Sequence, residues 1–103
     1  MKLLTKELRR KLPLLYATEK EKDPMVICKF FFPDFHRTWY AIEFDGEDTF
    51  YGYVVGDFPE LGYFSLSELK GTWSKLGLPV ERDLYFKPCR LSALQEATEK
   101  GMR

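Results

Sequence analysis

Three runs of β-favouring residues, joined by short turn signals, constrain the fold of this chain more than any other feature. The runs cover residues 25–32, 38–44 and 49–55 and are rich in Val, Ile, Phe, Tyr and Trp, which favour strands. Pro33-Asp34 separates the first two runs, and Asp45-Gly46, a hairpin signal, opens the link to the third. Connections this short join antiparallel neighbours, so the sequence predicts a meander.

The second run also predicts which side chains share a face of the sheet. Strict alternation places Trp39, Ala41 and Glu43 on one face. The residues expected on the other face are Thr38, Tyr40, Ile42 and Phe44. Gly52, inside the third run, and Gly56, just after it, are of the type that marks a bulge or a close approach.

Short helices are expected before and after these strands. Residues 3–12 carry leucines at helical spacing, with Thr5 as N-cap and Pro13 as the stop. Residues 65–68 and 92–95 match the capping box, in which Ser is followed three residues later by Glu or Gln. The last helix is expected to end at Gly101. The remaining expectations are a loop at 57–62, a short edge strand at 63–64 and a last short strand at 83–86.

This order predicts an α+β fold in which two or three short helices pack on one face of a small antiparallel meander sheet of three or four strands. The 103 residues form a single expected domain, 1–103, since this length leaves no room for two. No apolar run approaches the roughly 18 residues of a membrane span. Charged residues replace the apolar part of a signal peptide, so the expected compartment is the cytoplasm.

Charge is unevenly distributed along the chain, although 16 basic and 16 acidic residues give a net charge of +0. Residues 1–22 carry a net +4 and residues 70–103 a net +3. Residues 43–69 carry seven acidic and no basic side chains. A neutral total argues against binding to nucleic acid or membranes through bulk charge, but leaves open that opposite charges occupy different faces.

The main hypothesis is a non-enzymatic protein-binding module with an acidic contact surface at residues 43–60. Clustered carboxylates fit a basic surface on another protein, whose identity the sequence does not give. Two apolar residues in the expected loop at 57–62 would contact the partner protein at the tip of that loop. The proposed contact residues are Glu43, Asp45, Glu47, Asp48, Asp57, Phe58, Glu60 and Leu61.

Nucleic-acid binding is the first alternative. It would use the basic residues of the first helix, Lys2, Lys6, Arg9, Arg10 and Lys11. Aromatic side chains on the strands would supply a platform on which bases stack. Aromatic residues on strands more often belong to the hydrophobic core, and the signature of an RNA-recognition sheet is missing. The candidate platform consists of Phe31, Trp39, Tyr40, Tyr51 and Tyr53.

A metal-dependent enzyme is the third hypothesis, with Asp45, Glu47 and Asp48 in one turn as ligands for Mg²⁺ or Ca²⁺. The turn does not match an EF-hand loop, and a solvated hairpin turn is the commoner explanation. A Glu43–Asp45 carboxylate pair is a weak signal for acid–base chemistry. We assign no catalytic residue, metal ligand or cofactor, and we favour a protein that is not an enzyme.

Several distinctive stretches resemble one bacterial family. They are the opening residues 1–5, the run 39–52, the run 60–69 and the late run 77–86. Together they resemble the domain-of-unknown-function family 2958 (DUF2958) over nearly the whole chain. The resemblance implies a small stand-alone bacterial protein, often encoded on plasmids, phages and other mobile elements. It assigns no activity and no catalytic residues, and it hints at an accessory role, including one against host defence.

Overall fold

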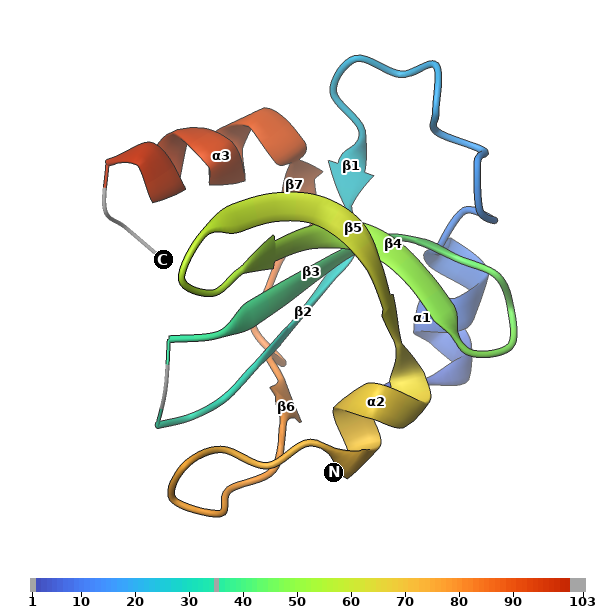
Figure 1. The fold of residues 1–103 in the computed structure, drawn as a ribbon. Coiled ribbons are helices and arrows are strands. Elements are labelled where there is room, and N and C mark those ends of the chain that lie inside the picture. Colours follow the sequence, from blue (N-terminus) through green and yellow to red (C-terminus); the bar gives the residue numbers. More distant parts are fainter. Residues whose placement is uncertain (1, 35, 101–103) are drawn as a thin grey trace.

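A five-stranded antiparallel sheet forms the centre of the computed structural model, which describes residues 2–34 and 36–100 (Figure 1). Its strand order is β5–β4–β3–β2–β6, so β2 to β5 form the predicted meander and β6 adds to the β2 side. A separate two-stranded sheet pairs β1 with β7. The strands are β1 (Met25–Val26), β2 (Cys28–Phe31), β3 (Thr38–Phe44), β4 (Thr49–Val55), β5 (Pro59–Ser65), β6 (Glu81–Arg82) and β7 (Cys89–Arg90).

The helices are α1 (Lys6–Lys11), α2 (Leu66–Gly71) and α3 (Leu91–Glu99). The first two begin as predicted. The Thr5 hydroxyl accepts a hydrogen bond from the backbone N–H of Leu8 at 3.2 Å, and the Ser65 hydroxyl accepts one from Glu68 at 3.0 Å. No helix in the described part of the chain is long and apolar enough to cross a membrane.

The start of α3 differs from the predicted capping box. The N-cap is Arg90, which makes no side-chain cap hydrogen bond. Asp23, far away in the sequence, accepts hydrogen bonds from the backbone N–H and the hydroxyl of Ser92 at 2.8 and 2.7 Å. Tertiary structure thus supplies the cap that the local motif was expected to supply. The predicted helix end at Gly101 lies outside the described residues.

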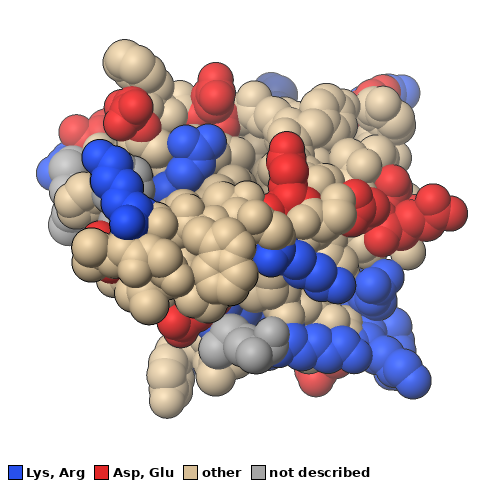
Figure 2. All heavy atoms as spheres, turned by 60° about the horizontal axis from the view of Figure 1, so that its bottom comes forward, with Lys and Arg blue, Asp and Glu red and all other residues tan. Residues whose placement is uncertain are grey.

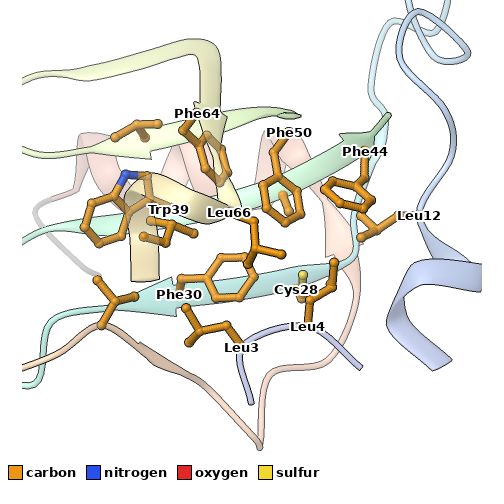
Figure 3. Packing of buried hydrophobic residues seen from close by; sticks show 14 of the residues in the cluster. Leu3, Leu4, Leu12, Cys28, Phe30, Trp39, Phe44, Phe50, Phe64 and Leu66 are labelled. Atoms are coloured by element: carbon orange, nitrogen blue, oxygen red, sulfur yellow. The ribbon is translucent and has the colours of Figure 1, made fainter. Parts of the chain in front are cut away.

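The helices cover both faces of the sheet, and not one face as predicted (Figure 1). On the first face, α2 and the segment around α1 bury a large aliphatic and aromatic core, in which Leu3, Leu4 and Leu12 meet strand phenylalanines (Figure 3). On the second face, α3 contributes Leu91 and Leu94 to a smaller core. That smaller core contains Val26, Tyr40, Ile42, Tyr53 and Val55.

A β-bulge in β3 changes the predicted alternation of side chains. The register with β4 shifts between Ala41 and Glu43. Because a bulge inserts one extra residue, the side chains beyond it exchange faces. Phe44 therefore joins Trp39 and Ala41 in the first core, while Glu43 lies on the second face, beside Tyr51 of β4.

Three strand predictions need correction. The expected loop at 57–62 is largely strand, since β5 pairs with β4 from Pro59 to Ser65. Pro59 and Gly62 resemble loop residues, but an edge strand tolerates Pro at its first position. Residues 83–86 form no strand, and the pairing lies at β6 and β7 instead. The first run divides at Ile27, because β1 leaves the sheet to pair with β7.

Gly52 confirms the expected close approach. A Cβ atom built there would lie 1.9 Å from the carbonyl oxygen of Tyr40, on the strand that carries the bulge. Its cross-strand partner Gly62 has nothing within 4 Å of the same built atom. The two glycines are therefore neighbours in the sheet with opposite steric requirements.

We predict that Gly52→Ala lowers the free energy of unfolding by about 3 kcal/mol or more, because backbone must shift to admit the methyl group. Gly62→Ala is the matched control and should change stability by no more than about 1 kcal/mol in either direction. Urea unfolding followed by circular dichroism measures both. Equal losses for the two variants would contradict the bulge geometry.

Candidate functional site

A hollow of about 320 Å³ lies on the second face of the sheet. It is bounded by the connection between α1 and β1, by β3 to β5, and by the start of α3. We call it the tyrosine hollow, because tyrosines from three separate segments line it. Its lining consists of Tyr16, Thr18, Glu19, Glu21, Lys22, Pro24, Ile42, Glu43, Tyr51, Leu61, Tyr63 and Leu91.

Glu43 holds the structure around the hollow together. Its side chain is buried, with 3% of the residue exposed. Oε1 accepts a hydrogen bond from the backbone N–H of Tyr16, and Oε2 accepts one from the backbone N–H of Thr18, both at 2.9 Å. The Thr18 hydroxyl donates to Oε2 as well. These bonds tie the connection between α1 and β1 to a strand 25 to 27 residues away.

Tyr16 has an unusual backbone conformation at the rim of the hollow. Its φ angle is +69°, in the left-handed region that bulky side chains rarely adopt. The hydrogen bond from its backbone N–H to Glu43 helps to hold this conformation, while the residue remains 63% exposed. Strained residues of this kind concentrate at functional sites, where surrounding structure stabilises them.

The three tyrosines form one continuous group. The rings of Tyr51 and Tyr63 lie with centroids 5.2 Å apart at an angle of 58°. A side-chain hydrogen bond with Tyr16 is the main cause that raises the pKa of Tyr63, with smaller contributions from partial burial and nearby charges. The Tyr63 hydroxyl therefore stays protonated at neutral pH, and the group presents aromatic rings to the hollow.

The hollow has the chemistry of a binding site for a positively charged group. Three carboxylates and one ammonium line it, together with the three tyrosine rings.

Cys28 lies in the first core, and its burial raises the pKa of the thiol to about 12. A thiol in that environment is not ionised at neutral pH and is not a nucleophile.

The structure separates the acidic residues that were predicted to form one contact surface. Glu43 is buried, whereas Asp45, Glu47 and Asp48 lie in the turn between β3 and β4. The other group, Asp57, Phe58, Glu60 and Leu61, lies at the turn between β4 and β5 and along the start of β5. The two turns are at opposite ends of β4, a seven-residue strand with a length of about 20 Å.

The acidic side chains of the first turn have structural roles. Oδ1 of Asp45 accepts hydrogen bonds from the backbone N–H groups of Glu47, Asp48 and Thr49 at 2.8, 2.8 and 3.0 Å. Asp48 accepts bonds from the backbone N–H and the hydroxyl of Ser67, at the start of α2. Within the described residues, no three His, Cys, Asp or Glu side chains are placed to hold a metal ion.

The basic residues of the first helix lie close to this acidic turn. Arg9 donates to the carbonyl oxygen of Gly46 at 3.2 Å and covers the ring of Phe44, and Lys11 pairs with Glu7 at 3.1 Å. Figure 2 shows Lys and Arg side chains gathered near Asp and Glu side chains on the α1 side of the molecule. The basic helix therefore lies beside the acidic turn, and the contact between them is the hydrogen bond from Arg9 to a backbone carbonyl.

The predicted aromatic platform does not form one surface. Trp39 belongs to the first core and Tyr40 and Tyr53 belong to the second, so their rings lie on opposite sides of the sheet and are buried. Phe31 lies on β2, with the ammonium group of Lys29 5.7 Å from its ring centroid. Only Tyr51 of the five lines the tyrosine hollow.

Sequence reasoning missed Tyr16, Thr18 and Tyr63 as parts of a site. They lie in segments with no shared motif or spacing, and only the fold brings them together. One signal was present in the sequence, because Glu43 is the only charged residue in the otherwise apolar or neutral run 38–44. Charged groups in such a setting are paired or hydrogen-bonded.

We predict that Glu43→Gln lowers the free energy of unfolding by about 2 kcal/mol, because an amide NH₂ replaces one oxygen that accepts hydrogen bonds. Hydrogen exchange at the Tyr16 and Thr18 amides should accelerate more than exchange in the first core. Glu47→Gln, at an exposed position nearby, is the control and should stay within about 0.5 kcal/mol of the parent. Unchanged protection at both amides would refute the role of Glu43.

The Asp45 turn predicts a pH dependence of stability. Its three backbone hydrogen bonds lower the pKa of Asp45 below its usual value. The carboxylate thus contributes stability that is complete above the unfolded pKa of about 3.9 and is lost as the pH falls through the lower folded value. Asp45→Asn keeps an oxygen acceptor without titrating, so its unfolding free energy should fall less on acidification. The prediction is wrong if the urea unfolding midpoints of the parent and of Asp45→Asn fall by the same amount between neutral and acidic pH.

Comparison with protein-family models matches residues 3–102 to a family described as "Protein of unknown function (DUF2958)". No curated protein and no solved structure matches the chain. The match covers nearly the whole sequence, so the chain belongs to this family.

Proposed function

We propose that this member of the DUF2958 family is a non-enzymatic protein-binding module that binds an extended segment of its partner along β5. The observation that carries the proposal is the position of β5 in the sheet. It pairs with β4 over all seven of its residues, and among the described residues no strand pairs with its outer edge.

An edge strand of this length leaves alternate N–H and C=O groups directed away from its neighbour. Such an edge can accept another strand, with main-chain hydrogen bonds supplying affinity and side-chain contacts supplying specificity. Natural proteins protect edges with short strands, charges or Pro. Here Pro59 and Glu60 protect only the beginning, and Leu61 and Tyr63 are exposed farther along.

The side chains at this edge support binding to a basic, partly apolar segment. Phe58 is 81% exposed and Leu61 is 45% exposed, so both offer apolar surface to a partner. Asp57 and Glu60 lie next to them and would attract basic residues. The proposed contact surface is therefore residues 57–65, a smaller region than the 43–60 segment inferred from sequence.

The cellular setting is inferred from the family resemblance alone. We infer an accessory protein of bacterial mobile elements that acts in the cytoplasm, with the countering of host defence as one form of that role. The partner would be another protein whose contacting segment adopts an extended conformation. This setting is independent of the choice of β5 as the contact site.

Nucleic-acid binding by α1 is the second candidate. Its supporting observation is that α1 has no buried residues, so Lys6 and Arg10 are directed to solvent. Arg9 and Lys11 already have contacts, and the neighbouring acidic turn would repel phosphate. A gel shift at low salt that disappears in a Lys6→Gln, Arg10→Gln double variant would favour this candidate over ours.

We predict that selection of a random linear peptide library on the purified protein enriches sequences that bind along β5. A bound strand should protect the outward-facing amides of residues 60–65 from hydrogen exchange, because these amides gain main-chain partners. Leu61→Glu should reduce the binding of selected peptides about tenfold or more, through lost apolar contact and a repulsive charge on this face.

Leu84→Glu is the matched control, since Leu84 is also exposed and follows β6 at the opposite edge of the sheet. It should leave peptide binding unchanged. Absence of enriched peptides would refute the proposal, as would protection that maps to α1 or β6.

A further inference from the structure

We propose that the tyrosine hollow receives a cationic side chain, lysine or arginine, from the bound partner segment. This inference rests on the proposed role of β5 for its peptide context. The hollow is nevertheless a separate feature with its own lining, and its affinity for a cation can be measured without a peptide.

Charge complementarity is the first argument. Glu19, Glu21 and Glu43 contribute carboxylates to the lining, against the single ammonium group of Lys22. Glu43 is buried, and its hydrogen-bond donors, the N–H groups of Tyr16 and Thr18 and the Thr18 hydroxyl, are neutral. Among the described residues, no basic side chain forms an ion pair with it. The field in the hollow therefore favours a positive group over a neutral or negative one.

The aromatic lining is the second argument. Rings of Tyr16, Tyr51 and Tyr63 surround the hollow on three different segments. The face of a tyrosine ring attracts a nearby cation through its quadrupole, and several rings around one site are a known arrangement for binding ammonium groups. Leu61 and Leu91 supply apolar wall for the methylene stem of a long basic side chain.

The position of the hollow relative to β5 is the third argument. Leu61 and Tyr63 are β5 residues two apart, so they share a face of the sheet, and both line the hollow. On one face of an antiparallel pair, opposed residues have Cβ atoms about 5 Å apart. A strand added to β5 would thus place alternate side chains beside Leu61 and Tyr63, within reach of the hollow for a residue as long as lysine or arginine.

The hollow is built before any ligand arrives. Glu43 holds Tyr16 in its left-handed conformation, and the rings of Tyr51 and Tyr63 pack with their centroids 5.2 Å apart. A site that is already ordered loses little conformational entropy on binding. Its volume of about 320 Å³ is sufficient for one side chain and lies at the lower limit of usual ligand pockets.

The test uses N-acetyl-arginine N-methylamide and its neutral isostere, N-acetyl-citrulline N-methylamide, titrated into the full chain by heteronuclear NMR. The arginine probe should shift the backbone and ring signals of Tyr16, Tyr51 and Tyr63 in a saturable manner. The citrulline probe should bind at least about threefold more weakly, since it has the same shape without the charge. The corresponding lysine probe should bind at the same residues.

Variants separate the ring and charge contributions. Tyr63→Leu should weaken binding of the arginine probe by about three- to fivefold, and Tyr63→Phe, which keeps the ring, by less. Tyr85→Leu, at an exposed tyrosine outside the hollow, is the control and should have no effect. Glu21→Gln should weaken binding and Lys22→Gln should strengthen it, because the two changes alter the local charge in opposite directions.

The outcomes for the hollow and for β5 can be told apart. Equal binding of the arginine and citrulline probes, or no shift at the three tyrosines, overturns the cation site even if selected peptides protect β5. Saturable, charge-dependent shifts at the tyrosines support the site even if no peptide protects β5, in which case the proposed function is the part that fails.

Discussion

The buried carboxylate of Glu43 is the interaction on which the candidate site depends. A carboxylate without partners would be unstable in the interior, and here the N–H groups of Tyr16 and Thr18 and the Thr18 hydroxyl supply them. The same bonds fix the connection between α1 and β1 against the sheet. The hydrogen bonds of the Glu43 carboxylate thus hold the segment that forms one side of the tyrosine hollow, and they stabilise the conformation of Tyr16.

The bulge in β3 makes this arrangement possible. Without the register shift between Ala41 and Glu43, regular alternation would direct the carboxylate into the first core, among phenylalanines and leucines. The bulge exchanges Glu43 with Phe44, so that the ring enters the core and the carboxylate faces the hollow. Gly52 accommodates the distortion, because any side chain there would collide with the carbonyl group of Tyr40.

The zero net charge of the sequence reflects an arrangement of separate charged groups in the fold. Near the turn between β3 and β4, the basic helix α1 lies beside the acidic turn, and Arg9 donates a hydrogen bond to the carbonyl oxygen of Gly46. Asp57 and Glu60 remain at the other end of β4, next to exposed Phe58. The acidic segment that looked continuous in sequence therefore contains one group with structural roles and one group beside the free sheet edge.

The family, the α+β class, β3 and β4 with their turn, and the capped starts of α1 and α2 were predictable from the sequence. The family follows from resemblance along nearly the whole chain and the α+β class from the order of the elements, whereas the strands and caps depend on local patterns. The bulge, the length of β5, the cap of α3 by Asp23 and the tyrosine hollow were not predictable. The cap and the hollow depend on groups 20 or more residues apart in the chain, and the bulge depends on a register that strict alternation conceals. The length of β5 was concealed because Pro59 and Gly62 resemble loop residues. Local chemistry determined the central strands β3 and β4 and the starts of α1 and α2. Only tertiary packing decided where Glu43 points and which side chains surround it, since a buried charge must find its partners wherever the fold places them.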